Sequence, residues 1–89
     1  MRRVLASETA RKQLDDLPPK ERKRLVNALQ ALGEDPIRPR PGADIKKLEG
    51  THPVKYRLRV GECRAVYLIA DTEVRIVEIF RRGRGYRLV

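Results

Sequence analysis

The chain has 89 residues and carries 21 Lys and Arg against 12 Asp and Glu, a formal net charge of +9. A chain of this length buries only about 60–65% of its unfolded surface, so we expect one modest core and a single domain over residues 1–89. Its 40% hydrophobic content forms no long apolar run, so we expect neither a signal peptide nor a membrane span.

Cys63 and His52 are each the only residue of their kind. One Cys excludes an intrachain disulfide, and one Cys with one His falls short of the ligand set of a zinc site. We therefore expect no metal, no other cofactor and a cytoplasmic location.

The excess of positive charge favours nucleic acid, an acidic protein or an anionic membrane surface as a partner. Arg supplies 15 of the 21 cationic residues. Because the planar guanidinium group can donate two hydrogen bonds to one phosphate, this bias favours a phosphate-rich partner.

The first half of the chain is predicted to form a strand and two helices. Val4 to Ala6 form a short strand, and Ser7 is the N-cap of the helix that follows. Pro18 and Pro19 end that helix, and Pro19 also fits the first turn of a second helix, which ends near Gly33. Apolar residues recur at helical spacing: Ala10, Leu14 and Leu17 in the first helix, and Leu25, Ala28, Leu29 and Leu32 in the second. We therefore expect a helical hairpin.

The second half is predicted to be a loop followed by strands. Residues 35–42 contain three prolines and a glycine, which indicates a loop. From Lys55 onward the apolar period changes to two, which predicts strands at about Lys55–Val60, Cys63–Ala70 and Val74–Arg81. The order predicts an α+β fold: an N-terminal strand, a two-helix hairpin and then an antiparallel meander sheet with the helices packed on one face.

The first predicted hairpin places arginines together. A two-residue turn at Gly61 and Glu62 puts Arg59 opposite Arg64 and Arg57 opposite Val66. Because side chains alternate, the three arginines share the face that the helices leave open, with Val66 and Leu68 as an apolar patch beside them. One interpretation is an ordinary solvated face. Opposed like charges destabilise a sheet, however, and an apolar patch rimmed by charge is typical of docking surfaces, so we favour an anion-binding face.

The C-terminal segment continues the positive charge with Arg81, Arg82, Arg84 and Arg87, and Tyr86 offers a ring that could stack on a base. The alternative interpretation is a frayed basic C-terminus. The sequence alone leaves both interpretations open.

Three segments together resemble the RelE/ParE toxin superfamily: residues 7–18, residues 47–50 and, above all, residues 56–67. The resemblance implies a RelE-like domain and a toxin of a type II toxin–antitoxin system. Its ribonuclease members cut messenger RNA in the ribosomal A site, which inhibits translation. It implies the catalytic residues Arg57, Arg59, Arg64, Arg82 and Tyr86, and we add Lys46, Lys47, Arg81 and Arg84 as RNA-binding candidates.

The implied activity is a metal-independent endoribonuclease acting on messenger RNA, and the implied partners are the ribosome and an acidic antitoxin. The best-known members carry lysines where this chain has Arg57 and Arg59, and an arginine cannot act as a general base. His52, Glu62, Asp44 and Tyr86 remain candidates for that role. The alternative functions are a gyrase-poisoning ParE-like toxin and a non-catalytic RNA- or ribosome-binding module.

Overall fold

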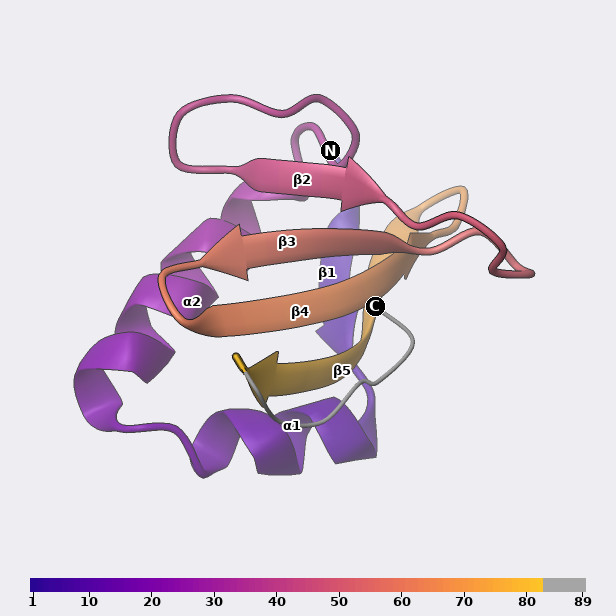
Figure 1. Ribbon diagram of the computed structural model, residues 1–89. Helices are drawn as coiled ribbons and strands as arrows, with labels where there is room; N and C mark the ends of the chain where they lie inside the picture. The colour runs from indigo at the N-terminus through magenta and orange to yellow at the C-terminus, as the bar shows by residue number, and fades with distance from the viewer. Residues whose placement is uncertain (83–89) are drawn as a thin grey trace.

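The computed structural model describes residues 1–82, which form two helices and a five-stranded sheet (Figure 1). The elements in chain order are β1 (Arg3–Ala6), α1 (Glu8–Asp15), α2 (Pro19–Ala31), β2 (Asp44–Lys47), β3 (Tyr56–Val60), β4 (Cys63–Ile69) and β5 (Glu73–Arg81). The strand order across the sheet is β1-β5-β4-β3-β2. The predicted α+β fold with both helices on one side of the sheet is confirmed.

The sheet differs from the predicted meander at its two edges. β1 pairs with β5 in parallel, so the sheet is mixed, while every other pair is antiparallel. β2 is an additional strand that the sequence did not indicate. It has four residues, of which Ile45 alone is buried, and this is too short an alternation to be recognised as a strand. Pairing with β3 supplies the backbone hydrogen bonds that hold it in place.

Both helices begin where the sequence predicts. Ser7 caps α1 by accepting a hydrogen bond from the Ala10 amide at 3.0 Å, and Pro19 occupies the first turn of α2. After α2 the chain packs against the N-terminal segment at Gly33, whose carbonyl accepts a hydrogen bond from the Arg2 amide at 2.8 Å. A Cβ on Gly33 would lie 2.6 Å from the Arg2 carbonyl oxygen, so this close approach requires glycine.

The core lies between the helices and the sheet. Its fully buried members come from both layers: Leu25 of α2, Leu32 after it, and Leu58, Ala65, Tyr67 and Ile79 of the sheet. Tyr67 is the largest of them, and its hydroxyl donates a hydrogen bond of 2.7 Å to the Pro36 carbonyl in the loop before β2. The loop is thereby fixed to the core, which positions the start of β2.

The outer edge of β5 is closed by α1 and by the residue that caps it. The Ser7 hydroxyl donates to the Val77 carbonyl at 3.2 Å, and the Gln13 side-chain oxygen accepts from the Ile79 amide at 2.6 Å. These bonds begin where the pairing of β1 with β5 stops, at Ile76. Side chains thus satisfy an edge that would otherwise be open to strand pairing. No helix within residues 1–82 is long and apolar enough to cross a membrane.

Candidate functional site

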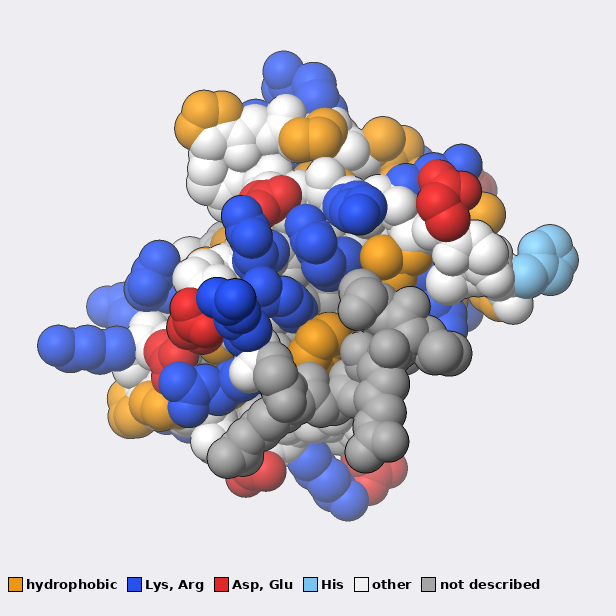
Figure 2. All heavy atoms as spheres, viewed as in Figure 1, with side chains coloured by type: hydrophobic (Ala, Val, Ile, Leu, Met, Phe, Trp, Pro, Cys, Tyr) orange, Lys and Arg blue, Asp and Glu red, His pale blue; other side chains and the backbone are white. Residues whose placement is uncertain are grey.

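The sheet face away from the helices carries a cluster of charged side chains. We define the arginine face as Asp44 and Lys46 of β2, Arg57 and Arg59 of β3, and Arg64 of β4, which alternate along their strands with core residues. Arg59 lies opposite Arg64, so the predicted hairpin register is confirmed. Figure 2 shows Lys and Arg side chains gathered in the middle of this side of the molecule.

Asp44 joins two of these arginines through its carboxylate. One oxygen, Oδ1, lies 3.3 Å from Nη2 of Arg57, and Oδ2 lies 2.8 Å from Nη2 of Arg59. The contact depends on β2, because its pairing places Asp44 directly opposite Arg59. In the sequence, Asp44 is one of four candidate bases, and no local signal links it to Arg57 and Arg59, which lie 13 and 15 positions further along.

Two guanidinium nitrogens on the arginine face are buried without a hydrogen-bond partner within residues 1–82. They are Nε of Arg57 and Nη1 of Arg64. A buried donor that lacks an acceptor is destabilising, by about 1–3 kcal/mol and more for a charged group. An anion bound against the arginines would reduce the repulsion between the opposed side chains. The arrangement is therefore suited to binding a phosphate.

The prediction that Val66 and Leu68 form an apolar patch on the open face is wrong for Val66, which is fully buried, with 0% of its surface exposed. Val66 sits in a central strand between Arg57 and Glu78, whose longer side chains stand on either side of it. Leu68 is half-buried. Sequence reasoning treated every residue on the open face as exposed, which fails for a short side chain in the middle of a sheet. The face therefore presents the charged side chains together with the half-buried Leu68.

The other predicted site residues are divided among several places. Lys46 belongs to the arginine face, whereas Lys47 points to the other side of β2 and lines a hollow with Tyr56. Arg81 also faces the helices, where its Nη2 lies 3.3 Å from Oε1 of Glu21 in α2. Neither Lys47 nor Arg81 is brought together with the three arginines.

Arg82 lies at the end of the described chain, beside the turn between β3 and β4. Its side chain is exposed, and its backbone amide donates a hydrogen bond of 2.7 Å to the Glu62 carbonyl. Two predicted site residues, Arg84 and Tyr86, lie outside the described residues.

A hollow of about 380 Å³ adjoins the arginine face and adds two cations that the sequence did not indicate. It lies between α2, the loop before β2 and the β3–β4 turn, and Arg24, Arg40, Asp44 and Arg59 contribute to its lining. Arg40 is held by donating to the carbonyls of residues 31, 35 and 38. These arginines meet only in the folded chain, so no sequence spacing could have revealed them.

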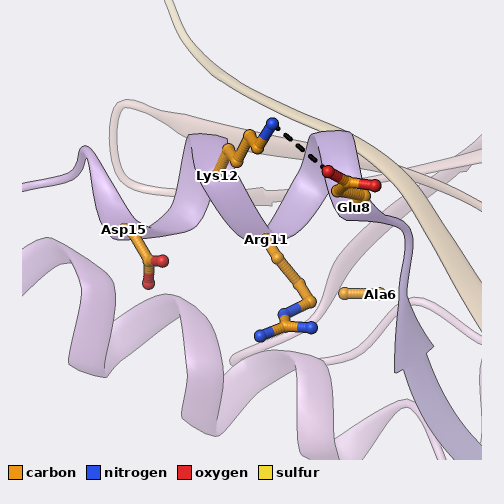
Figure 3. Close-up of a pocket in the computed structure, with 5 residues that line it drawn as sticks. All are labelled: Ala6, Glu8, Arg11, Lys12 and Asp15. Carbon is orange, nitrogen blue, oxygen red and sulfur yellow. Dashed lines mark ion pairs between the residues drawn. The ribbon is translucent and has the colours of Figure 1, made fainter.

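Another hollow, at the start of α1, gathers no comparable set (Figure 3). Lys12 and Glu8 form an ion pair of 3.3 Å within one helix, and Arg11 points away from both of them. A pair of this kind on a helix surface contributes only about 0.3–0.5 kcal/mol, and its charges largely cancel. The arginine face therefore remains the candidate site.

Fold and site together define a small basic α+β domain whose open sheet face carries a cluster of arginines. The chain matches, over residues 4–86, the family described as the ParE toxin of the type II toxin–antitoxin system parDE. It is 37% identical over 78 residues to RelE1 of Methanocaldococcus jannaschii, covering 85% of this chain and 84% of that relative.

Solved structures agree. The RelE–RelB complex of Pyrococcus horikoshii contains a chain 32% identical to this one, with a TM-score of 0.78 over 94% of this chain and 98% of that one. A chain of the RelBE2 toxin–antitoxin complex of Mycobacterium tuberculosis is 28% identical, with a TM-score of 0.76 and 93% of each chain covered. This chain belongs to the RelE/ParE superfamily of type II toxin–antitoxin toxins.

Proposed function

We propose that this toxin is a metal-independent endoribonuclease that cleaves messenger RNA in the ribosomal A site and so inhibits translation. The observation that carries the proposal is the arginine face, where guanidinium groups from two adjacent strands present buried donors that lack an acceptor within residues 1–82. An RNA phosphate supplies such acceptors. Guanidinium groups also supply the positive charge that stabilises a transition state on phosphorus.

The chemistry begins with attack of a ribose 2′-hydroxyl on the adjacent phosphate, in line with the departing 5′-oxygen. Arg57 and Arg64 hold the phosphate oxygens, and Arg59 adds positive charge beside them. Arg82 stabilises the departing oxygen from the end of β5, and Tyr86 stacks on or orients a base. Positioning by the ribosome supplies much of the rate, because a chain of 89 residues offers few contacts to the rest of the message.

Flanking cations extend the contact with RNA. Lys46 stands on the arginine face beside Arg57, and Arg24 and Arg40 line the adjoining hollow. The phosphates on either side of the cleaved bond can contact these cationic side chains. Binding should therefore weaken with added salt, as expected for an interface built on phosphate contacts.

We also propose that a short acidic antitoxin binds this toxin in the cytoplasm and blocks it. Two structural relatives were solved as toxin–antitoxin complexes. With a net charge of +9, the chain offers an acidic segment strong electrostatic complementarity. Such a segment would cover the arginine face and exclude RNA. We expect the antitoxin to be encoded by the gene next to that of the toxin, and co-expression of the two proteins tests this. The expected result is a stable complex, a higher melting temperature of the toxin and no cleavage of RNA. A toxin that stays monomeric and active would contradict it.

Primer extension on a translated message, with DNA integrity followed in parallel, tests the activity. We expect new 5′ ends with the wild-type toxin, far fewer with Arg64→Gln, and wild-type numbers with Arg11→Gln. Arg11 is a matched control because it is an exposed arginine of α1, away from the arginine face.

Two other functions would give different results in the same assay. The match to a family described as ParE toxins keeps gyrase poisoning as the second candidate. DNA breaks with intact RNA would indicate that function. Binding to ribosomes with both nucleic acids intact would indicate a non-catalytic module.

A further inference from the structure

The proposed reaction needs a group that removes the proton of the attacking 2′-hydroxyl, and arginine cannot do so because it stays protonated. We propose that Asp44 is this general base. The inference rests on the proposed ribonuclease function and assigns a catalytic residue to it.

The position of Asp44 fits the role. Its carboxylate contacts Arg57 at 3.3 Å and Arg59 at 2.8 Å, yet its side chain remains 42% exposed, so a substrate can reach it. A carboxylate offers about four acceptor directions, and these two contacts use one on each oxygen. The remaining directions can accept the hydrogen bond of a ribose hydroxyl.

Arg57 places the base next to the phosphate. Its Nη2 donates to Asp44, whereas its Nε is buried with no acceptor within residues 1–82. A phosphate oxygen bound to another nitrogen of this guanidinium group would share one rigid planar group with the carboxylate. In RNA the 2′-hydroxyl neighbours the phosphate that it attacks, so this shared contact brings base and nucleophile together.

The other candidate bases are less well placed. His52 lies in the connection between β2 and β3, at the opposite end of this strand pair from Asp44 and Arg59. Glu62 is exposed in the β3–β4 turn and forms no ion pair with an arginine of the face within residues 1–82. Within the described chain, Asp44 is the acidic side chain that contacts these arginines.

The 2′-oxygen gives its proton to a carboxylate oxygen of Asp44 and forms a bond to phosphorus, while the bond from phosphorus to the 5′-oxygen breaks. The departing oxygen takes a proton from water, and the products are a 2′,3′-cyclic phosphate and a 5′-hydroxyl end. Asp44 then returns its proton to water.

Proton transfer also changes the charge around the phosphate. While Asp44 is ionised, it neutralises part of the charge of Arg57 and Arg59. Once it holds the proton, both guanidinium groups act fully on the phosphorane, just when negative charge has accumulated there. The two arginines therefore stabilise the transition state more than the bound substrate, which is the condition for rate enhancement.

The test compares Asp44→Asn, Asp44→Ala and the control Glu62→Gln, which removes the same charge from the nearby turn. Single-turnover cleavage of a ribosome-bound message is measured, together with binding of the toxin to ribosomes that carry a 2′-O-methyl message. We expect both Asp44 variants to cleave about 10²–10⁴-fold more slowly with unchanged or tighter binding. Added formate should partly restore Asp44→Ala, and Glu62→Gln should cleave at close to the wild-type rate.

Three results would overturn either the role of Asp44 as general base or the ribonuclease function on which it rests. Cleavage by Asp44→Asn at the wild-type rate or faster would show that Asp44 is only a counter-ion, which overturns the proposal. Slow cleavage with weakened binding and no formate rescue would assign Asp44 to positioning the arginines, which also overturns it. A wild-type toxin that yields no new RNA ends would instead overturn the ribonuclease function itself.

Discussion

The two faces of the β3–β4 hairpin differ in whether their polar groups are satisfied. On the helix side, Leu58 and Ala65 are fully buried, and the one hydroxyl of Tyr67 has a carbonyl partner. On the other side, Arg57 and Arg64 present buried nitrogens with no acceptor within residues 1–82. The same strands therefore supply packed core residues on one face and unpaired guanidinium nitrogens on the other. Residues that a protein leaves unsatisfied are candidates for function.

If the helix-side face carries the stability, Leu58→Ala should have the largest effect on folding. Leu58 is fully buried in the central part of the sheet, so truncation removes packing and leaves a cavity. We expect the free energy of unfolding to fall by about 2–5 kcal/mol in urea denaturation. A loss below about 1 kcal/mol would show that the core can collapse around the cavity, and would weaken the comparison of the two faces.

Arg82→Ala should strongly reduce activity with little effect on folding. Its side chain is exposed, and its backbone hydrogen bond to the Glu62 carbonyl survives the change. Loss of one donor to a developing charge typically costs about 10²–10³ in rate, and we expect that loss in single-turnover cleavage.

The neighbouring Arg81 provides the control for this prediction. It points to the helix side and pairs with Glu21, so Arg81→Ala should cleave at close to the wild-type rate. Equal losses in the two variants would mean that the end of β5 contributes general charge instead of a defined contact.

Part of this contrast could be predicted from the sequence. The period of two from residue 55 and the two-residue turn at 61–62 predicted the pairing of Arg59 with Arg64 and the face that they share. These are local signals, because alternation and turn length fix a hairpin register. The capping Ser7 and the paired prolines likewise placed the helices.

What could not be predicted depends on contacts between distant segments. β2 has one buried residue, so its pairing with β3, and hence the contact of Asp44 with Arg57 and Arg59, follows from tertiary structure alone. The same holds for Arg24, which reaches the site from α2. The placement of Arg81 on the helix side follows from its alternation with Ile79, although Arg81 and Arg82 are adjacent basic residues in the sequence.

The loop that Tyr67 fixes to the core should respond to acid. Hydrogen bonds from the backbone amides of Arg38 and Ile37, and from the Arg38 side chain, lower the pKa of Asp35 to about 2. The folded pKa therefore lies below the value of about 3.9 in the unfolded chain. The ionised carboxylate stabilises the fold fully above about pH 3.9, and this stabilisation is lost as the pH falls toward about 2. Urea denaturation across this pH range should show that the free energy of unfolding of the wild type falls toward that of Asp35→Asn. If the difference in the free energy of unfolding between wild type and Asp35→Asn stays constant with pH, the lowered pKa of Asp35 is contradicted.

The smallest expected effect belongs to the arginine face itself, where Arg64→Gln should stabilise the free toxin. Arg59 opposes Arg64 directly, and Asp44 compensates Arg59, whereas Arg64 has no acidic partner within residues 1–82. Opposed like charges destabilise a sheet by about 0.2–1 kcal/mol, so removing one should raise the melting temperature by about 1–8 °C in low salt. The gain should shrink in high salt, because screening already weakens the repulsion.

Arg11→Gln, which removes the same charge from α1, should show no such gain. If Arg64→Gln instead melts at a lower temperature at both salt concentrations, the arginine contributes to the fold, and the contrast between a stabilising face and a binding face does not hold at this position.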